Sequence, residues 1–240
     1  QVGCPLDCKF CATGLMGYKR NLSAGEIVDQ YILISKNFSK SIITNIVYMG
    51  MGEPLLNFDN VLKSLERFLD EKSFGLGRNR ITISTSGIPN KIMELADKPY
   101  RVKLALSLHS CFEDIRSQIM PINKKYSLKE VIESLEYYYR KTKNPITFEY
   151  LMLNNINDTD KDIRAITKLT RRFPSKINII PFNSIEHMAP DGLSAMLAPT
   201  ERNKILDFVE KLRQNGVTVI IRDTQGDDIA AACGQLAVKY

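Results

Sequence analysis

Hydrophobic positions along the chain follow two alternating periods. Short runs rich in β-branched and aromatic residues predict strands, and amphipathic patterns of helical period lie between them. The predicted strands cover residues 46–51, 80–84, 102–108, 146–152, 176–181 and 218–222. The predicted helices cover residues 23–35, 60–69, 88–96, 128–142, 160–172 and 200–215. This alternation indicates a parallel sheet wrapped by helices, which is an α/β fold.

Polar residues mark the starts of three helices. Ser23 and Ser127 are each followed three residues later by a glutamate, which is the pattern of a capping box. Thr200, followed by a glutamate, predicts a third start. Residues 184–199 follow neither period, and we expect them to form a surface loop over the top of the sheet.

Composition limits the class of protein. A chain of 240 residues with 44% hydrophobic content is sufficient for one domain with a buried core. Its five cysteines are too few and too clustered for a secreted disulfide framework, and no apolar run approaches 18 residues. We therefore expect a cytoplasmic protein that does not enter a membrane. The net charge of +6 permits a polyanionic partner, although many soluble domains are equally basic.

Three cysteines near the beginning of the chain form the most informative motif. Cys4, Cys8 and Cys11 lie within eight residues, and no second cysteine pair or histidine pair follows. A structural zinc site normally needs four protein ligands. A 4Fe-4S cluster held by three thiolates keeps one iron open for a cofactor. The spacing therefore favours a cluster with an open iron over zinc.

Further polar residues follow the predicted strands. In parallel sheets, ligands gather at the carboxyl ends of the strands. Gly52 allows a ligand to approach the backbone and Glu53 offers a carboxylate to an amine, but both also suit a simple turn. A single histidine is more often structural than a ligand. The remaining candidates at these ends are Ser84, Ser107, Leu108, His109 and Asn183.

The motifs together resemble those of a known family. Taken in order, they match the RlmN/Cfr family of radical S-adenosylmethionine RNA methyltransferases over essentially the whole chain. The matching segments are residues 4–11, 49–55, 84–87, 106–109, 180–183 and 222–237.

This resemblance implies a fold and a domain organisation. The family has a partial (β/α)6 TIM-type barrel, whose first strand would lie directly before the cysteine motif and is largely missing here. We expect residues 1–240 to be the catalytic core of a longer protein. A helical RNA-binding domain, a general base and a second cysteine would then lie upstream of Gln1.

The resemblance also implies roles for individual residues. Cys4, Cys8 and Cys11 would bind the 4Fe-4S cluster, and Gly52 and Glu53 would hold the methionyl amino group of S-adenosylmethionine. Cys233 would carry the methyl group, although a free cysteine among small residues also suits a buried structural position. Two S-adenosylmethionine molecules would be used per turnover. The other expected contacts to S-adenosylmethionine are Ser84, Ser107, Leu108, His109 and Asn183.

The implied activity is methylation of carbon 2 of adenine in 23S ribosomal RNA and in transfer RNA. The expected electron donor is flavodoxin or ferredoxin, and the expected state is a monomer. Three alternatives remain open. They are Cfr-type methylation of carbon 8, a radical enzyme that does not methylate, and an RNA-binding module with a structural metal. The last is suggested by basic pairs at residues 19–20, 124–125 and 171–172, which are more often solvated.

Overall fold

The centre of the molecule is a sheet of parallel strands. The computed structural model describes residues 1–37, 43–222, 232 and 234–236. Within this part of the chain, six strands pair in the order β3-β4-β5-β6-β7-β8, so each predicted strand is confirmed. They are β3 (Ile46–Tyr48), β4 (Ile81–Thr85), β5 (Lys103–Ser107), β6 (Ile146–Met152), β7 (Ser175–Pro181) and β8 (Val219–Ile221).

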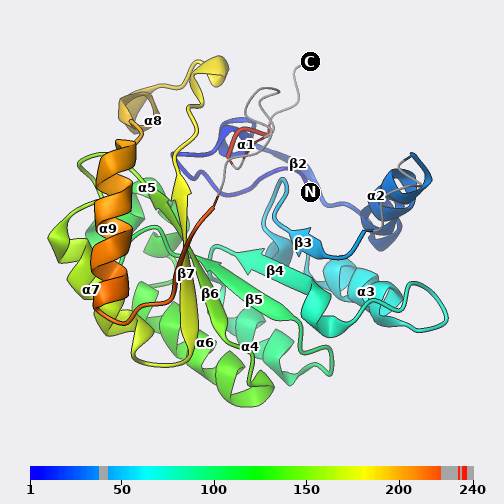
Figure 1. Cartoon of the computed structure of the whole chain (residues 1–240). Coiled ribbons are helices and arrows are strands. Elements are labelled where there is room, and N and C mark those ends of the chain that lie inside the picture. Colours follow the sequence, from blue (N-terminus) through cyan, green and yellow to red (C-terminus); the bar gives the residue numbers. More distant parts are fainter. Residues whose placement is uncertain (38–42, 223–231, 233, 237–240) are drawn as a thin grey trace.

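Helices cover the outer side of the sheet, as a partial barrel requires. Figure 1 shows α2 and α3 beside β3, α4 and α6 behind the central strands, and α7 and α9 beyond β7. In the described part of the chain, four 3-10 turns occupy Pro54–Leu56, Arg78–Arg80, Pro121–Lys124 and Glu186–Met188. The described helices are α1 (Ala12–Leu15), α2 (Ala24–Asn37), α3 (Phe58–Leu69), α4 (Pro89–Asp97), α5 (Glu113–Ile119), α6 (Leu128–Thr142), α7 (Asp160–Thr170), α8 (Gly192–Met196) and α9 (Arg202–Gln214).

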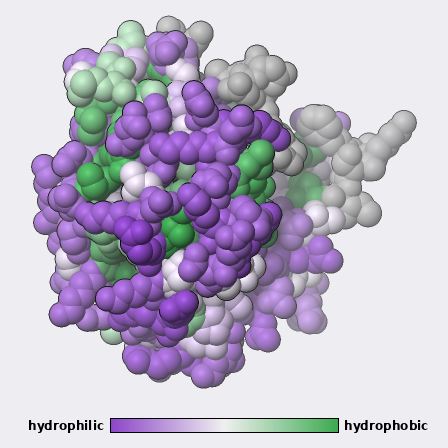
Figure 2. Space-filling view, turned by 60° about the vertical axis from the view of Figure 1, so that its left-hand side comes forward, coloured by the Kyte–Doolittle hydropathy of each residue, from purple (hydrophilic) through white to green (hydrophobic). Residues whose placement is uncertain are grey.

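The outer helical face is mainly hydrophilic. Figure 2, which brings the side of α7 and α9 forward, shows polar residues over most of that surface. The core-facing stripe of α9 is instead apolar and buried, including Phe208 and Leu212. No helix among the described residues is long and apolar enough to cross a bilayer.

Two predicted capping boxes are present. The Ser127 hydroxyl accepts from the backbone N–H of Glu130, whose carboxylate accepts from the Ser127 N–H in return. Ser23 and Glu26 make the same reciprocal pair at the start of α2. Each box satisfies backbone donors that a helix start leaves without partners.

Two other predictions, on the start of α9 and on residues 184–199, need correction. Helix α9 begins at Arg202 after Glu201, and Thr200 instead donates its hydroxyl to buried Asp158, at 3.1 Å. Residues 184–199 are not a simple loop, because they include the turn Glu186–Met188 and helix α8.

A small second core fastens the cysteine motif to the top of the sheet. It joins Ala12 of α1 to Leu151 of β6 and Ile180 of β7, with Phe10 packed against it. The Lys9 N–H also donates to the carbonyl of Ile119, at 2.9 Å. Before and after the motif, β1 (Val2–Gly3) and β2 (Tyr18–Arg20) pair antiparallel and lie outside the six-stranded sheet. These contacts hold the cysteines over the carboxyl ends of the strands.

Candidate active site at the carboxyl ends of the strands

One cavity collects nearly all of the predicted site residues. It has a volume of about 720 Å³ and lies between the cysteine loop and the carboxyl ends of the strands. A larger and more open hollow of about 940 Å³ lies between α2 and α3 and contains none of them, so size alone does not identify the site. The predicted residues on the cavity wall are Cys4, Cys8, Cys11, Gly52, Glu53, Ser84, Ser107, His109 and Asn183.

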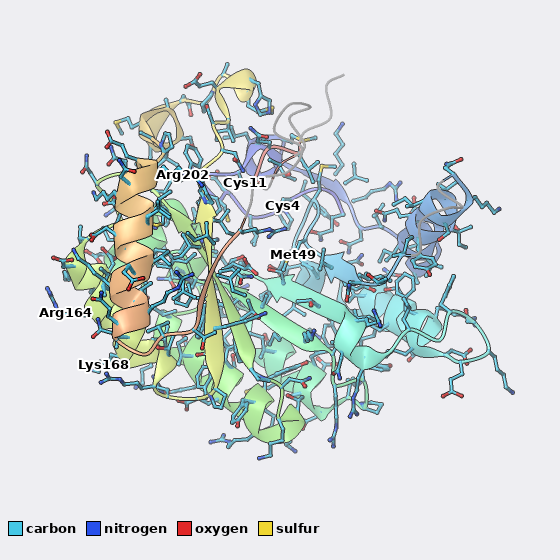
Figure 3. All side chains as sticks on the ribbon, viewed as in Figure 1. Cys4, Cys11, Met49, Arg164, Lys168 and Arg202 are labelled. Carbon is cyan, nitrogen blue, oxygen red and sulfur yellow. The ribbon has the colours of Figure 1, made fainter. Side chains whose placement is uncertain are left out.

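The three cysteines lie on a compact loop. The Cys11 N–H donates to the carbonyl of Cys8, at 3.1 Å, and the Leu6 N–H donates to the sulfur of Cys4, at 3.4 Å. All three thiols are unpaired and half-buried. Figure 3 shows Cys4 and Cys11 together above the strands, with Met49 below them near the end of β3.

The electrostatics of this loop suit a bound cationic centre. Burial, and then repulsion from the thiolate of Cys11, raises the pKa of Cys4 to about 11. Burial and the other two thiolates likewise raise the pKa of Cys8. Among the described residues, no three His, Cys, Asp or Glu side chains converge on a single ion. A 4Fe-4S cluster fits this donor set, because each thiolate binds its own iron.

The loop after β3 places Gly52 and Glu53 beside the cysteines. Gly52 has a φ of +98°, and a Cβ there would lie 2.5 Å from the Gln1 side chain. The Glu53 carboxylate is buried and accepts three hydrogen bonds, from the Leu55 N–H at 3.0 Å and from the N–H and hydroxyl of Ser86 at 2.8 and 2.7 Å. Burial raises the pKa of Glu53, and these hydrogen bonds oppose that shift. Glu53 thus joins the β3 and β4 loops.

Two serines present hydroxyls to the cavity. Ser84 lies near the end of β4 and Ser107 ends β5, and both are half-buried on the cavity wall. Neither hydroxyl has a hydrogen-bond partner among the described residues. Both are therefore suitably placed to bind a polar ligand.

Leu108 does not reach the cavity. Its side chain is fully buried in the main core. Its N–H donates to the carbonyl of Glu149, at 2.9 Å, and its own carbonyl accepts from Arg116 Nε, at 3.1 Å. Its role as a ligand contact stays a prediction that this geometry does not favour, and its visible role is to anchor the end of β5.

His109 lies on the cavity wall as a neutral imidazole. Its Nδ1 accepts from the Leu151 N–H, at 3.0 Å, so its proton is on Nε2. Burial, and then the charge of Arg116, lowers the pKa of His109 to about 3. The ring meets Phe10 edge to face, with centroids 4.7 Å apart. Its backbone has a φ of +54°, and its carbonyl accepts from Asn157 at 2.7 Å. His109 thus joins the cysteine loop to β6.

The described residues of the C-terminal signature lie against the cysteine loop and helix α1. Cys233 lies outside the described residues, but Ala232 and Gly234, on either side of it in the chain, line the cavity. The Gly234 carbonyl accepts from the Ala12 N–H, at 2.7 Å, and the Leu236 carbonyl accepts from the Thr13 hydroxyl, at 2.6 Å. The signature is therefore joined to the helix that follows the cysteines.

Two buried charges at the site were not predicted from the sequence. Arg116 is fully buried on α5, a helix that the hydrophobic pattern did not indicate. Glu149 is 4% exposed within the strand ITFEYLM, where a single charge among apolar residues was a signal that could have identified it.

Comparison with known proteins defines the family. The Radical SAM superfamily model matches residues 1–169. A Christiangramia forsetii protein named "Probable dual-specificity RNA methyltransferase RlmN" is 45% identical, across 100% of this chain and 67% of the relative. A Thermotoga maritima protein of the same name is also 45% identical, with the same coverage. The crystal structure of a radical SAM methyltransferase from Sphaerobacter thermophilus superposes with a TM-score of 0.91 at 38% identity, covering 98% of this chain and 67% of that one. The chain therefore belongs to the RlmN family of the radical SAM superfamily, and it is an enzyme.

Proposed function

We propose that this enzyme methylates RNA by radical S-adenosylmethionine chemistry. The observation that carries the proposal is the meeting of three free thiols, Gly52, Glu53 and two unpartnered serine hydroxyls on one cavity. The curated relatives are named as RNA methyltransferases. The alternative function, an RNA-binding module with a structural metal, does not explain this cavity.

The residues have separate tasks in this proposal. Cys4, Cys8 and Cys11 hold the 4Fe-4S cluster, which supplies the electron for reductive cleavage of S-adenosylmethionine. Gly52 and Glu53 bind the methionyl end of that molecule next to the cysteines. The hydroxyls of Ser84 and Ser107, with Asn183, contact the rest of it. The second core under the cysteine loop helps to exclude water.

The finer proposal is methylation at carbon 2 of adenine, in 23S ribosomal RNA and in transfer RNA, with Cys233 as the methyl carrier. The thiolate of Cys233 would take the methyl group of one S-adenosylmethionine and release S-adenosylhomocysteine, and a second molecule would be cleaved in the same turnover. The position of Ala232 and Gly234 on the cavity wall supports this role. The dual specificity in the relatives' names supports the proposal of two kinds of RNA substrate.

The partners and the location follow from charge and redox chemistry. We propose residues 1–240 as the catalytic core, acting as a monomer in the reducing cytoplasm, where thiols stay available for metal. The net charge of +6 suits RNA and an acidic electron carrier such as flavodoxin or ferredoxin. Two basic pairs are partly neutralised, because Arg20 pairs with Glu26 and Arg172 with Glu136, each at 2.7 Å. The scattered basic pairs are therefore poor support for a separate RNA-binding function.

The position of the methyl group tests this function. The longer protein of which we propose residues 1–240 to be the catalytic core is reconstituted anaerobically with iron and sulfide. It is then incubated with ribosomal RNA or transfer RNA, a reductant and methyl-labelled S-adenosylmethionine. Nucleoside mass spectrometry should then find label on carbon 2 of adenine in both RNAs. Label on carbon 8 would establish the Cfr-type activity instead. Cleavage of S-adenosylmethionine without labelled RNA would indicate a radical enzyme that does not methylate.

A further inference from the structure

Glu149 is a buried charge on the cavity wall that the predicted site does not include. It lies in the middle of β6, and its side chain is 5% exposed. The strand register places it between Ser107 of β5 and Asn178 of β7. Glu149 and Ser107 both line the cavity. A carboxylate is costly at such a position unless something binds it.

Only one of its two oxygens has a hydrogen-bond partner. Asn178 Nδ2 donates to Oε1, at 2.9 Å. Oε2 is buried and has no partner among the described residues. Among the described residues, the cation that approaches Oε2 is Arg222, whose Nη1 is 4.0 Å away and too far for a hydrogen bond. The cavity wall therefore carries a buried carboxylate oxygen, Oε2 of Glu149, that receives no hydrogen bond from the described residues.

Burial and the neighbouring groups act on this carboxylate in opposite directions, and none of these groups donates a hydrogen bond to Oε2. Burial raises the pKa of Glu149, while the Asn178 hydrogen bond and the charges of Arg222 and Lys176 oppose that shift. Arg222 is itself turned toward Met49, with Nη1 3.8 Å from the thioether sulfur. A carboxylate in its ionised form binds a hydroxyl or amino donor more strongly than a neutral acceptor does.

The position along the sheet identifies the part of the ligand that reaches Glu149. The Gly52–Glu53 turn follows β3, and β6 is three strands away, or about 14 Å along the sheet. A methionyl group held beside β3 leaves the nucleoside to extend toward β5, β6 and β7. The hydroxyls of a ribose are suitable donors, since carboxylates bind this diol in other nucleotide sites.

We propose that Glu149 binds a ribose hydroxyl of S-adenosylmethionine through Oε2. This inference rests on the proposed function, because it requires S-adenosylmethionine in the cavity. Glu149 then acts as a specificity-determining residue that fixes the nucleoside, and Asn178 holds its carboxylate in position. If Oε2 bound a water or a donor on the RNA instead, the three ligands in the test below would bind the native protein equally.

Calorimetry with an unreactive ligand tests the inference directly. Binding of S-adenosylhomocysteine, and of its 2′-deoxy and 3′-deoxy forms, is measured on the reconstituted protein and on Glu149→Gln. The substitution keeps the size of the side chain but replaces one acceptor oxygen with a donor. We expect it to weaken S-adenosylhomocysteine about ten- to a hundredfold. At least one deoxy form should bind the native protein more weakly than S-adenosylhomocysteine does, by a similar factor. The same deoxy form should bind Glu149→Gln at least as tightly as S-adenosylhomocysteine does.

A matched control is Asp158→Asn, which makes the same chemical change at a buried carboxylate outside the cavity, paired with Lys204 at 2.8 Å. It should leave the affinity unchanged. Unchanged affinity in Glu149→Gln would overturn the inference, and so would equal binding of all three ligands to the native protein, a comparison that needs no variant. Failure of the native protein to bind S-adenosylhomocysteine at all would overturn the proposed function together with this inference.

Discussion

The guanidinium of Arg116 donates from Nη2 to the carbonyl of Ser86, at 2.6 Å, and so connects helix α5 to the loop after β4. The same side chain donates to the carbonyls of Ser107, at 3.1 Å, and Leu108, at 3.1 Å, and it also binds the Asn123 side chain. Burial lowers the pKa of Arg116 to about 10, so it remains charged at neutral pH. One buried cation thus holds the ends of two strands that form the cavity wall.

Arg116→Met should destabilise the protein substantially. The substitution leaves the carbonyls of Ser86, Ser107 and Leu108 without a donor in a buried site. We expect a loss on the order of 3 kcal/mol in the free energy of unfolding, measured by urea titration. Arg164→Met on exposed α7 is the control and should change that free energy by less than about 0.5 kcal/mol. Equal stability of the two variants would show that the Arg116 contacts contribute little.

Glu53→Ala should weaken S-adenosylmethionine binding while iron content is retained. It removes a carboxylate beside the cysteines, and a lost charge-assisted contact corresponds to about a ten- to hundredfold loss of affinity in calorimetry. Because Glu53 also binds Ser86, Ser86→Ala is the control for a purely structural effect. It should retain most of the affinity, because the carboxylate is still present. Unchanged affinity in Glu53→Ala would remove its side chain from the ligand site.

His109 should make the protein less stable in acid. Its pKa is lowered from 6.5 to about 3 in the folded protein, so below pH 6.5 the unfolded chain binds a proton that the folded protein does not. Stability from this group is complete above pH 6.5 and is lost as the pH falls toward 3. Between pH 7.5 and 5.5, the free energy of unfolding should fall about 1 kcal/mol more in the native protein than in His109→Asn. Parallel pH profiles would indicate that His109 titrates normally.

The sequence predicted the elements with strong local patterns and missed those that depend on tertiary contacts. The strand at Ile146–Met152 and the helix at Leu128–Thr142 are long, and the helix carries its own capping box. Helix α5 was missed because it has only seven residues. The sequence also gives no sign that Arg116 is buried against backbone carbonyls, so an arginine there is expected to be on the surface. Helix α8 is similarly short, with five residues.

The same distinction applies to the site. The sequence predicted which strand-end residues meet on one cavity wall, because parallel strands bring their carboxyl ends together. It could not decide that Leu108 turns into the core while Ser107 and His109 face the cavity, since that depends on the path of the chain after β5. Nor could it show that Glu53 binds Ser86, which lies 33 residues away.

The iron content of the reconstituted protein tests the central claim most directly. Cys4, Cys8 and Cys11 should together hold about four irons and four sulfides per chain, with one iron open. Cys8→Ala should lose the cluster, whereas Cys111→Ala, which changes a thiol outside the cavity wall, should keep it. Adding S-adenosylmethionine should alter the electron paramagnetic resonance spectrum of the reduced native cluster. A variant with all three cysteines changed to alanine that still retained its iron would contradict the account.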